Sequence, residues 1–355
     1  MIFSVGTAKA LFPRFLLLLG VSVLLLSCET VSYYSQAARG QAAMVLGRDD
    51  IQELLVSDEL SDDLRAKFSM VLEIREFAEQ QLYLPVEDNY SSYVDLKREH
   101  VVWNVFAAPE FSVDPLNWCF PIAGCVSYRG YFSEAAAMKY ASNLQQDGFD
   151  VYTGGVDAYS TLGWFEDPLP SSVMTRADYQ LAALIFHELA HQIVYLQGDT
   201  SFNESFATSV EREGLRRWLT SNGEPSLIER ARLDSERRQQ FVDLVSDYRD
   251  VLEQLYSREL GEIEMRSQKN EIQNSLREAY QQLKRQWGTY GGYDAWFSQS
   301  LNNAQLSTVS SYNQMVPFFD ELLAKSNGDL QQFYAEVKRI SKLDEVSRGA
   351  LIPEI

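Results

Sequence analysis

The chain has 355 residues, 46% of them hydrophobic, and a formal net charge of −19. Its length allows one large domain or two small ones, and its 19 tyrosines and 19 phenylalanines predict a packed core. So acidic a balance argues against nucleic-acid binding and against electrostatic docking on anionic lipid, and it is typical of a soluble surface.

Residues 1–27 carry the features of a bacterial lipoprotein signal peptide. Lys9 and Arg14 precede an apolar run, Phe15 to Leu26, that is too short to span a bilayer comfortably. A small residue then directly precedes Cys28, which resembles a lipobox, so cleavage would expose this cysteine for acylation. A plain signal peptide and an uncleaved anchor helix are the alternatives.

Cys28 would hold the mature chain on a bilayer, because several acyl chains on one residue give stable anchoring. The next residue is Glu29 rather than aspartate, and the resemblance to the bacterial sorting rule favours the outer membrane, with the protein facing the periplasm. We therefore expect the membrane as a partner through this lipid, and no nucleic acid.

Patterning along the mature chain predicts a mostly α-helical α+β fold with a small mixed sheet. Apolar spacing predicts helices at 33–43, 49–79 and 133–147, the last with Ser133 as its N-cap. Clusters of β-branched and aromatic residues predict strands at 101–106, 126–132, 149–152 and 158–165.

Two cysteines remain after Cys28. Cys119 and Cys125 lie six residues apart, with Pro121 and Gly124 between them to let the chain turn. An exported chain meets an oxidising compartment, so the pair predicts a disulfide. A cysteine-based metal site is the alternative, and it is less favoured because no histidine stands beside the pair.

The most specific motif is H-E-L-A-H at 187–191. On a helix, residues four apart share a face, so His187 and His191 can bind one metal ion while Glu188 accepts a proton from its water. The flanking residues are apolar almost all round, which predicts a buried helix and makes unpartnered histidines costly. Two satisfied core histidines on an ordinary helix are the alternative.

A second helix, predicted at about 203–219, would supply a third ligand. The motif helix is expected to begin at a capping box, Thr175–Asp178, and to end at Gly198. A catalytic zinc takes three protein ligands, and Glu204 would return over the histidine pair after this turn. A surface glutamate favoured by the helix dipole is the alternative. Glu211, two turns further along the same face, is a weaker ligand candidate.

This chemistry needs two further groups, and the sequence does not choose between the candidates. An oxyanion needs a donor, and the candidates by chemistry alone are His100, Tyr293 and Tyr312. An aminopeptidase also needs a carboxylate to hold the substrate amine. The predicted strand at 158–165 would accept substrate backbone along its edge, and the acids beside it are Asp157, Glu166 and Asp167.

Residues 227–287 differ in composition from the rest of the chain. Charges and glutamines alternate with widely spaced apolar residues, which predicts a long helical hairpin, Ile228–Ser257 and Glu262–Trp287. A solvated packing arm and a substrate-binding or partner-binding arm are both open. The expected regions are the signal peptide at 1–27, a zincin-like catalytic region at 28–226, the hairpin at 227–287, and at 288–355 two C-terminal helices, split by Gly328, that pack on the catalytic region.

Five segments together resemble the bacterial putative aminopeptidase family of zinc-dependent lipoproteins. They are H-E-L-A-H-Q, F-N-E-S-F-A at 202–207, Y-Y-S-Q-A-A-R-G-Q at 33–41, W-C-F-P-I-A-G-C-V-S-Y-R-G-Y-F at 118–132 and L-N-N-A-Q-L at 301–306. The resemblance covers nearly all of the mature chain. It implies zinc at His187, His191 and Glu204, with Glu188 catalytic. The pattern is also similar to gluzincins, in which an aspartate four residues after the ligand glutamate buttresses a histidine, and Thr208 stands at that place here.

These features predict a zinc-dependent peptidase, by resemblance an aminopeptidase, anchored by lipid in the bacterial envelope. Two other classes stay open. One is an envelope lipoprotein with a binding or assembly role and a structural metal site, and the other is a metal-dependent hydrolase of non-peptide substrates. Glu188 favours the peptidase, because a structural zinc site needs no general base and tends to use four protein ligands.

Overall fold

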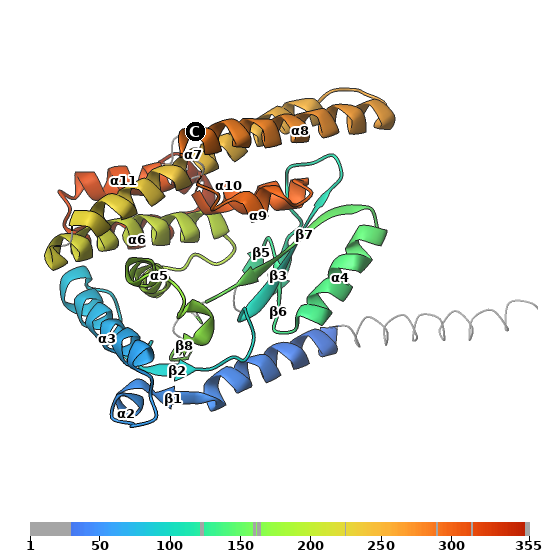
Figure 1. Ribbon diagram of the computed structural model, residues 1–355. Helices are drawn as coiled ribbons and strands as arrows, with labels where there is room; N and C mark the ends of the chain where they lie inside the picture. Colours follow the sequence, from blue (N-terminus) through green and yellow to red (C-terminus); the bar gives the residue numbers. More distant parts are fainter. Residues whose placement is uncertain are drawn as a thin grey trace, which may run out of the picture.

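The computed structural model describes residues 30–120, 124–158, 161, 165–223, 225–288, 290–313 and 315–351 (Figure 1). Helices dominate these residues, and the strands form small sheets of mixed direction, which confirms the predicted α+β class. None of the described helices combines the length and the apolar character that crossing a bilayer requires. Cys28 and the predicted signal segment lie outside the described residues.

The central sheet lies between two helical layers. Its middle strand, β3 (Val102–Pro109), pairs antiparallel with β6 (Arg129–Tyr131) on one side and with β7 (Phe149–Val156) on the other. α4 (Glu134–Gln146) covers one face and α10 (Asn303–Asn313) the other (Figure 1). The predicted strands at 101–106 and 149–152 and the predicted helix at 133–147 all correspond to these elements.

Side chains along β3 alternate between the two layers, as the period of a strand requires. Trp103 and Val105 join the cluster under α4, whereas Phe106 packs with Ala304 of α10. β3 is therefore buried on both faces, which explains its nearly continuous apolar sequence. Ser133 caps α4 as predicted, because its Oγ accepts a hydrogen bond from the backbone N–H of Ala136 at 3.3 Å.

The prediction of one helix over 49–79 is wrong. Asp50 accepts hydrogen bonds from two backbone N–H groups and starts the short helix α2, and Ser61 then caps a separate helix, α3. Two capping side chains therefore divide a stretch whose apolar spacing looks continuous. The bounds are β1 (Arg48–Asp50), α2 (Ile51–Leu55) and α3 (Asp62–Leu82), after a helix over 30–46 that fits the prediction at 33–43.

A small three-stranded sheet and a two-stranded sheet complete the strands. β1 pairs antiparallel with β2 (Ser92–Val94), which pairs parallel with β8 (Leu169–Pro170). β4 (Trp118–Phe120) and β5 (Gly124–Val126) form a hairpin, and a disulfide joins Cys119 to Cys125 across it, as predicted. The strand predicted at 126–132 is thus divided between β5 and β6.

The strand predicted at 158–165 lies mostly outside the described residues. Ala158, Thr161 and Phe165 are the described part of it, and none of them is in a strand. The edge of the central sheet is instead β7, which ends at Val156.

Two antiparallel helices, α5 (Asp178–Ala190) and α6 (Thr200–Asn222), form the centre of the largest apolar cluster. α3 packs on α5, while Phe206 of α6 packs on aromatic residues of α11 (Val316–Lys325) and α12 (Leu330–Ser341). Gly328 separates α11 from α12 as predicted, with a left-handed φ of 75°. The C-terminal region nevertheless holds more than two helices, because α9 (Asp294–Phe297), α10 and α13 (Glu345–Gly349) also form.

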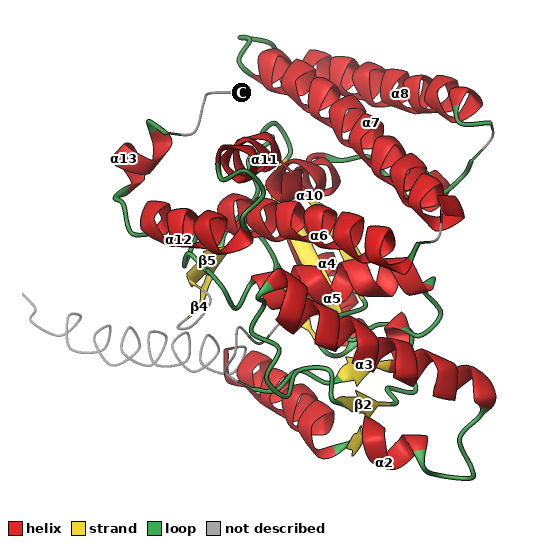
Figure 2. Ribbon diagram, turned by 90° about the vertical axis from the view of Figure 1, so that its left-hand side faces the viewer, coloured by secondary structure: helices red, strands yellow, loops and turns green. Residues whose placement is uncertain are grey.

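The hairpin consists of α7 (Pro225–Tyr256) and α8 (Glu262–Gln286), close to its predicted bounds. Figure 2 shows it lying across α6 and α10. Its apolar residues form a second cluster with α9 and α10, in which Tyr280 stacks on Phe297 with ring centroids 3.9 Å apart. The hairpin is thus a packed arm with its own core.

Candidate metal centre

The motif helix is largely buried, as its sequence predicts. Leu181, Ile185, Phe186 and Leu189 are fully buried against α3 and α6. Polar groups on this helix therefore lie in an apolar surrounding, where each needs a partner or a ligand.

The ends of α5 differ from the prediction. Ala177 occupies the N-cap, and the Gln180 side-chain oxygen accepts a hydrogen bond from its N–H at 3.2 Å, so no capping box forms at Thr175. The helix ends at Ala190 instead of reaching Gly198. His191, at the C-cap, keeps right-handed helical dihedrals, so the two histidines still share one face.

Three donor groups meet on that face. One ligand atom each from His187, His191 and Glu204 lie within 4.8 Å of one another. Oε2 of Glu204 lies 3.3 Å from Nε2 of His187, and its Oε1 lies 3.8 Å from Nε2 of His191. Glu204 is in the second turn of α6, directly after the turn that reverses the chain, so the predicted return over the histidine pair is found.

The spacing of these atoms fits a metal ion. Ligands about 2.0–2.2 Å from a tetrahedral ion lie roughly 3.4 Å from each other, which is close to both distances from Glu204. The separation from His191 is too long for a hydrogen bond, so a shared ion would satisfy both groups better than direct contact does. Two imidazoles and a carboxylate form a set that zinc accepts.

Glu211 lies behind His187 rather than in the donor group. Its Oε2 is 3.0 Å from Nδ1 of His187, the ring nitrogen that faces away from Glu204. Its Oε1 accepts a hydrogen bond from the Arg238 guanidinium of α7, also at 3.0 Å. Thr208, between the two glutamates on α6, is buried. Glu211 therefore occupies the place of an orienting partner instead of a ligand.

Burial and charge move the pKa values of this cluster in opposite directions. Burial lowers the pKa of His187, but hydrogen bonds to Glu204 and Glu211 outweigh it and raise this pKa to about 10. Burial lowers the pKa of His191 to about 4. Without a metal, one imidazole therefore carries a proton and the other is neutral.

The acids of the cluster differ as well. Burial raises the pKa of Glu188 to about 7, with His187 opposing and Glu204 adding to the shift. Burial also acts to raise the pKa of Glu211, but Arg238 and His187 reverse this and hold it at about 2. Glu188 alone is thus placed to exchange a proton near neutral pH.

A cleft of about 1090 Å³ opens beside the donor group, between α5, α6, α7 and the end of β7. His187, Glu188 and Glu211 all line it. Its apolar lining includes Ala183, Leu184, Leu215, Leu219, Ile228 and Ala231. The cleft follows α5 from His187 back to Tyr179, which at 1.5 Å per residue is a length of about 12 Å.

Of the predicted oxyanion donors, neither His100 nor Tyr293 is among the residues that line this cleft. His100 bonds through Nδ1 to Asp157 at 2.7 Å, and Tyr293 stacks on Phe241 of the hairpin. Tyr312 belongs to α10, but its side chain is outside the described part of the chain. The sequence did not single out Tyr128, whose pKa is raised by burial and then by the charges of Glu204 and Glu188.

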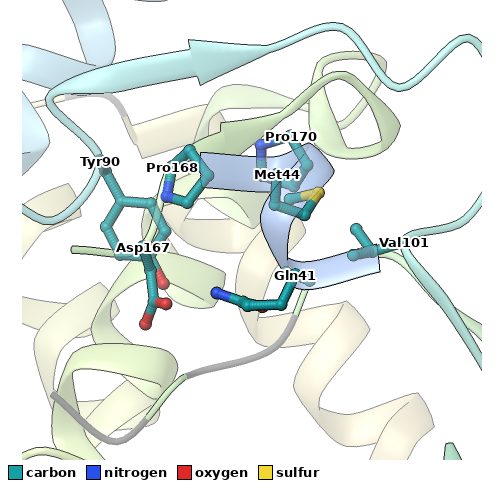
Figure 3. Close-up of a pocket in the computed structure, with 8 residues that line it drawn as sticks. Gln41, Met44, Tyr90, Val101, Asp167, Pro168 and Pro170 are labelled. Carbon is teal, nitrogen blue, oxygen red and sulfur yellow. The ribbon is translucent and has the colours of Figure 1, made fainter. Parts of the chain in front are cut away.

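The three acids proposed for the substrate amine lie in different places. Asp157 lines the cleft at the end of β7, where it is paired with Arg176 at 2.8 Å and with His100. Glu166 forms a surface ion pair with Arg48. Asp167 is buried beside Tyr90 at a small separate cavity under the N-terminal helix (Figure 3).

The fold and this site define a helical α+β protein with a largely buried His-His-Glu group, of which His187 lines a large cleft. The sequence profile of the putative aminopeptidase family matches residues 32–352, so the chain belongs to that family. No curated protein and no solved structure matches the chain.

Proposed function

We propose that the protein is a zinc-dependent aminopeptidase with a zincin-like site. The observation that carries this proposal is the cleft into which both His187 and Glu188 face, beside a donor set that suits zinc. Membership of the putative aminopeptidase family supports the same reaction class. A lipid at Cys28 would anchor the enzyme to the outer membrane, and the expected sign is release of the Cys28→Ser protein from membranes.

Glu188 is the proposed general base. Zinc held by His187, His191 and Glu204 would polarise the scissile carbonyl and lower the pKa of the attacking water. Glu188 takes a proton from that water as the new C–O bond forms. As the C–N bond breaks, Glu188 returns the proton to the leaving nitrogen. A buried carboxyl group beside the ion can serve first as the proton acceptor and then as the donor.

The part of the β7 edge that follows Val151, on the side away from β3, is the proposed binding site for substrate backbone. The carbonyl of Val151 accepts a hydrogen bond from Asn302, so odd-numbered residues of β7 face away from β3. The N–H and C=O groups of Thr153 and Gly155 therefore point outward, and Gly155 lines the cleft. A peptide could add there as a further strand, with its scissile bond toward Glu188.

The test compares wild-type protein (residues 29–355) with Glu188→Gln. We expect the variant to keep zinc, measured by elemental analysis, and to lose about 10³-fold in cleavage of a peptide library. Glu253→Gln, which changes an exposed glutamate of α7, is the matched control. A Glu188→Gln protein that cleaves as fast as the control would contradict the assigned role.

The same assay tests the direction of cleavage. An aminopeptidase recognises a free amine, and Asp157 is the acid among the three that lines the cleft. A peptide should therefore be cleaved much faster than its N-acetylated twin. Equal rates would mean that no amine is recognised and that the enzyme is an endopeptidase.

A further inference from the structure

The α7–α8 hairpin reaches the metal centre through Arg238. Its Nη1 donates to Oε1 of Glu211 at 3.0 Å, and Oε2 of Glu211 lies 3.0 Å from Nδ1 of His187. One carboxylate thus connects the hairpin to an imidazole of the site, and each of its oxygens has its own partner. The Glu211 side chain is 15% exposed, whereas the Arg238 side chain is 44% exposed, so the carboxylate is shielded from solvent more than the guanidinium.

Neighbouring cations on the same two helices have other partners. Arg212 is directed to Gln239 and Asp320, with distances of 3.2 and 3.8 Å. Arg237 pairs within α7 with Asp234 at 3.4 Å. Of these three arginines, Arg238 is therefore the one that contacts Glu211.

We propose that Glu211 and Arg238 are positioning residues for His187, and that one role of the hairpin is to hold this pair in place. The proposal rests on the proposed function, because it takes His187 as a metal ligand. A neutral imidazole has two tautomers, and only the one with its proton on Nδ1 offers the Nε2 lone pair toward Glu204. Glu211 accepts that Nδ1 proton in a hydrogen bond. Arg238 fixes the orientation of the carboxylate and offsets its charge.

The second histidine has no such support. Nδ1 of His191 is buried and finds no hydrogen-bond partner among the described residues. Its ring packs edge-on against that of His187, with centroids 5.0 Å apart. Among the described residues, the side-chain hydrogen bond to Nδ1 that orients this pair of histidines is therefore the one at His187. Replacing Arg238 or Glu211 should disturb the orientation of the His187 ring directly.

The experiment measures zinc affinity by competition with a chromophoric chelator, in the full mature chain. Removal of a partner that orients a metal ligand typically weakens binding 10–100-fold. We expect a loss in this range for Glu211→Gln, a loss of about tenfold for Arg238→Gln, and recovery of most of it in Arg238→Lys. Because Arg238 acts through Glu211, the double variant should bind no more weakly than Glu211→Gln alone.

Two controls separate positioning from general damage. Arg285→Gln removes an exposed arginine of α8, and it should leave zinc affinity unchanged. Nitrogen-15 NMR of zinc-loaded protein should find the His187 proton on Nδ1 in wild type and a mixture or loss of that signal in Glu211→Gln. Melting curves of the metal-free proteins report whether each variant folds.

Each outcome of the affinity measurements either supports or overturns one of the two proposals. Arg238→Gln with wild-type affinity, or additive losses in the double variant, would overturn the positioning role while leaving the peptidase proposal intact. If Arg238→Gln fails to fold, Arg238→Lys takes its place, and a zinc affinity as low as that of Glu211→Gln would equally overturn the positioning role. A wild-type chain that binds no zinc would overturn the proposed function itself.

Discussion

The α5–α6 pair and the α7–α8 hairpin both bury charged groups, but the partners of these groups differ between the two regions. In the hairpin, Lys269 is 6% exposed, and its ammonium donates to Asp150 at 2.6 Å and to the Glu110 carbonyl at 2.8 Å. In the α5–α6 pair, burial raises the pKa of Glu188 to about 7, and Nδ1 of His191 has no hydrogen-bond partner among the described residues. The buried charge of Lys269 is paired within the protein, whereas His187, His191 and Glu204 are grouped so that they could hold a metal ion.

The largest effect on stability is expected from Lys269→Met. Breaking a buried ion pair costs about 3–5 kcal/mol, because the remaining charge is left without its partner. Denaturant unfolding should detect this loss, while zinc affinity measured well below the melting temperature should stay at the wild-type value. Weaker zinc binding in Lys269→Met would show that the metal centre depends on the buried charge of the hairpin, so the two regions would not be independent.

A pH-dependent gain in stability is expected from Glu188→Gln in metal-free protein. Burial raises the pKa of Glu188 from 4.5 to about 7, so its neutral form is favoured in the folded state. The stability it contributes is fully present below pH 4.5 and is lost as pH rises through 7. Glutamine stays neutral, so at pH 8 the variant should be more stable than wild type by on the order of 3 kcal/mol.

The measurement is chemical unfolding at pH 5 and pH 8 with a chelator present. The difference between the two proteins should be small at pH 5, because Glu188 is then mostly neutral in the folded protein. Glu253→Gln should behave like wild type at both values. A difference of the same size at pH 5 and pH 8 would show that titration of Glu188 is not its cause.

A smaller effect is expected from replacing both disulfide cysteines by serine. The bridge between Cys119 and Cys125 closes a short loop, and its removal should cost about 2–3 kcal/mol. Gly124 in this loop has a φ of 76° and lies so close to Gln197 and Gly198 that no side chain would fit there. The loop therefore supports the connection between α5 and α6.

Hydrogen exchange shows which part of the molecule loses stability when the disulfide is removed. Amides in the connection at 191–199 should exchange faster in the double serine variant, and amides of α8 should not. Uniform acceleration over both regions would mean that the disulfide stabilises the molecule as a whole instead of this connection.

Much of the site could be predicted from local sequence. The apolar surrounding of the H-E-L-A-H motif predicted a buried helix, and thirteen residues were enough to predict a turn that returns Glu204 to the histidines. Both inferences depend on helical periodicity and on short loops, which act over a few turns. The same periodicity placed Glu211 on the face of Glu204, although it did not distinguish a ligand from an orienting partner.

The rest depends on contacts that no local pattern carries. Arg238 lies 27 residues from Glu211 on a helix rich in charges, so nothing in the sequence marks it among its neighbours. The break between α2 and α3 was missed because apolar spacing continues across two capping residues, Asp50 and Ser61. Apolar spacing indicates which face of a helix is buried. It does not show whether the helix is interrupted between one apolar residue and the next.

Zinc binding by wild type and by His191→Ala tests the central claim most directly. Elemental analysis of the purified mature chain should find about one zinc per protein, and His191→Ala should lose most of it, because only two of the three ligands remain. A His191→Ala protein that binds zinc as tightly as wild type would contradict the account.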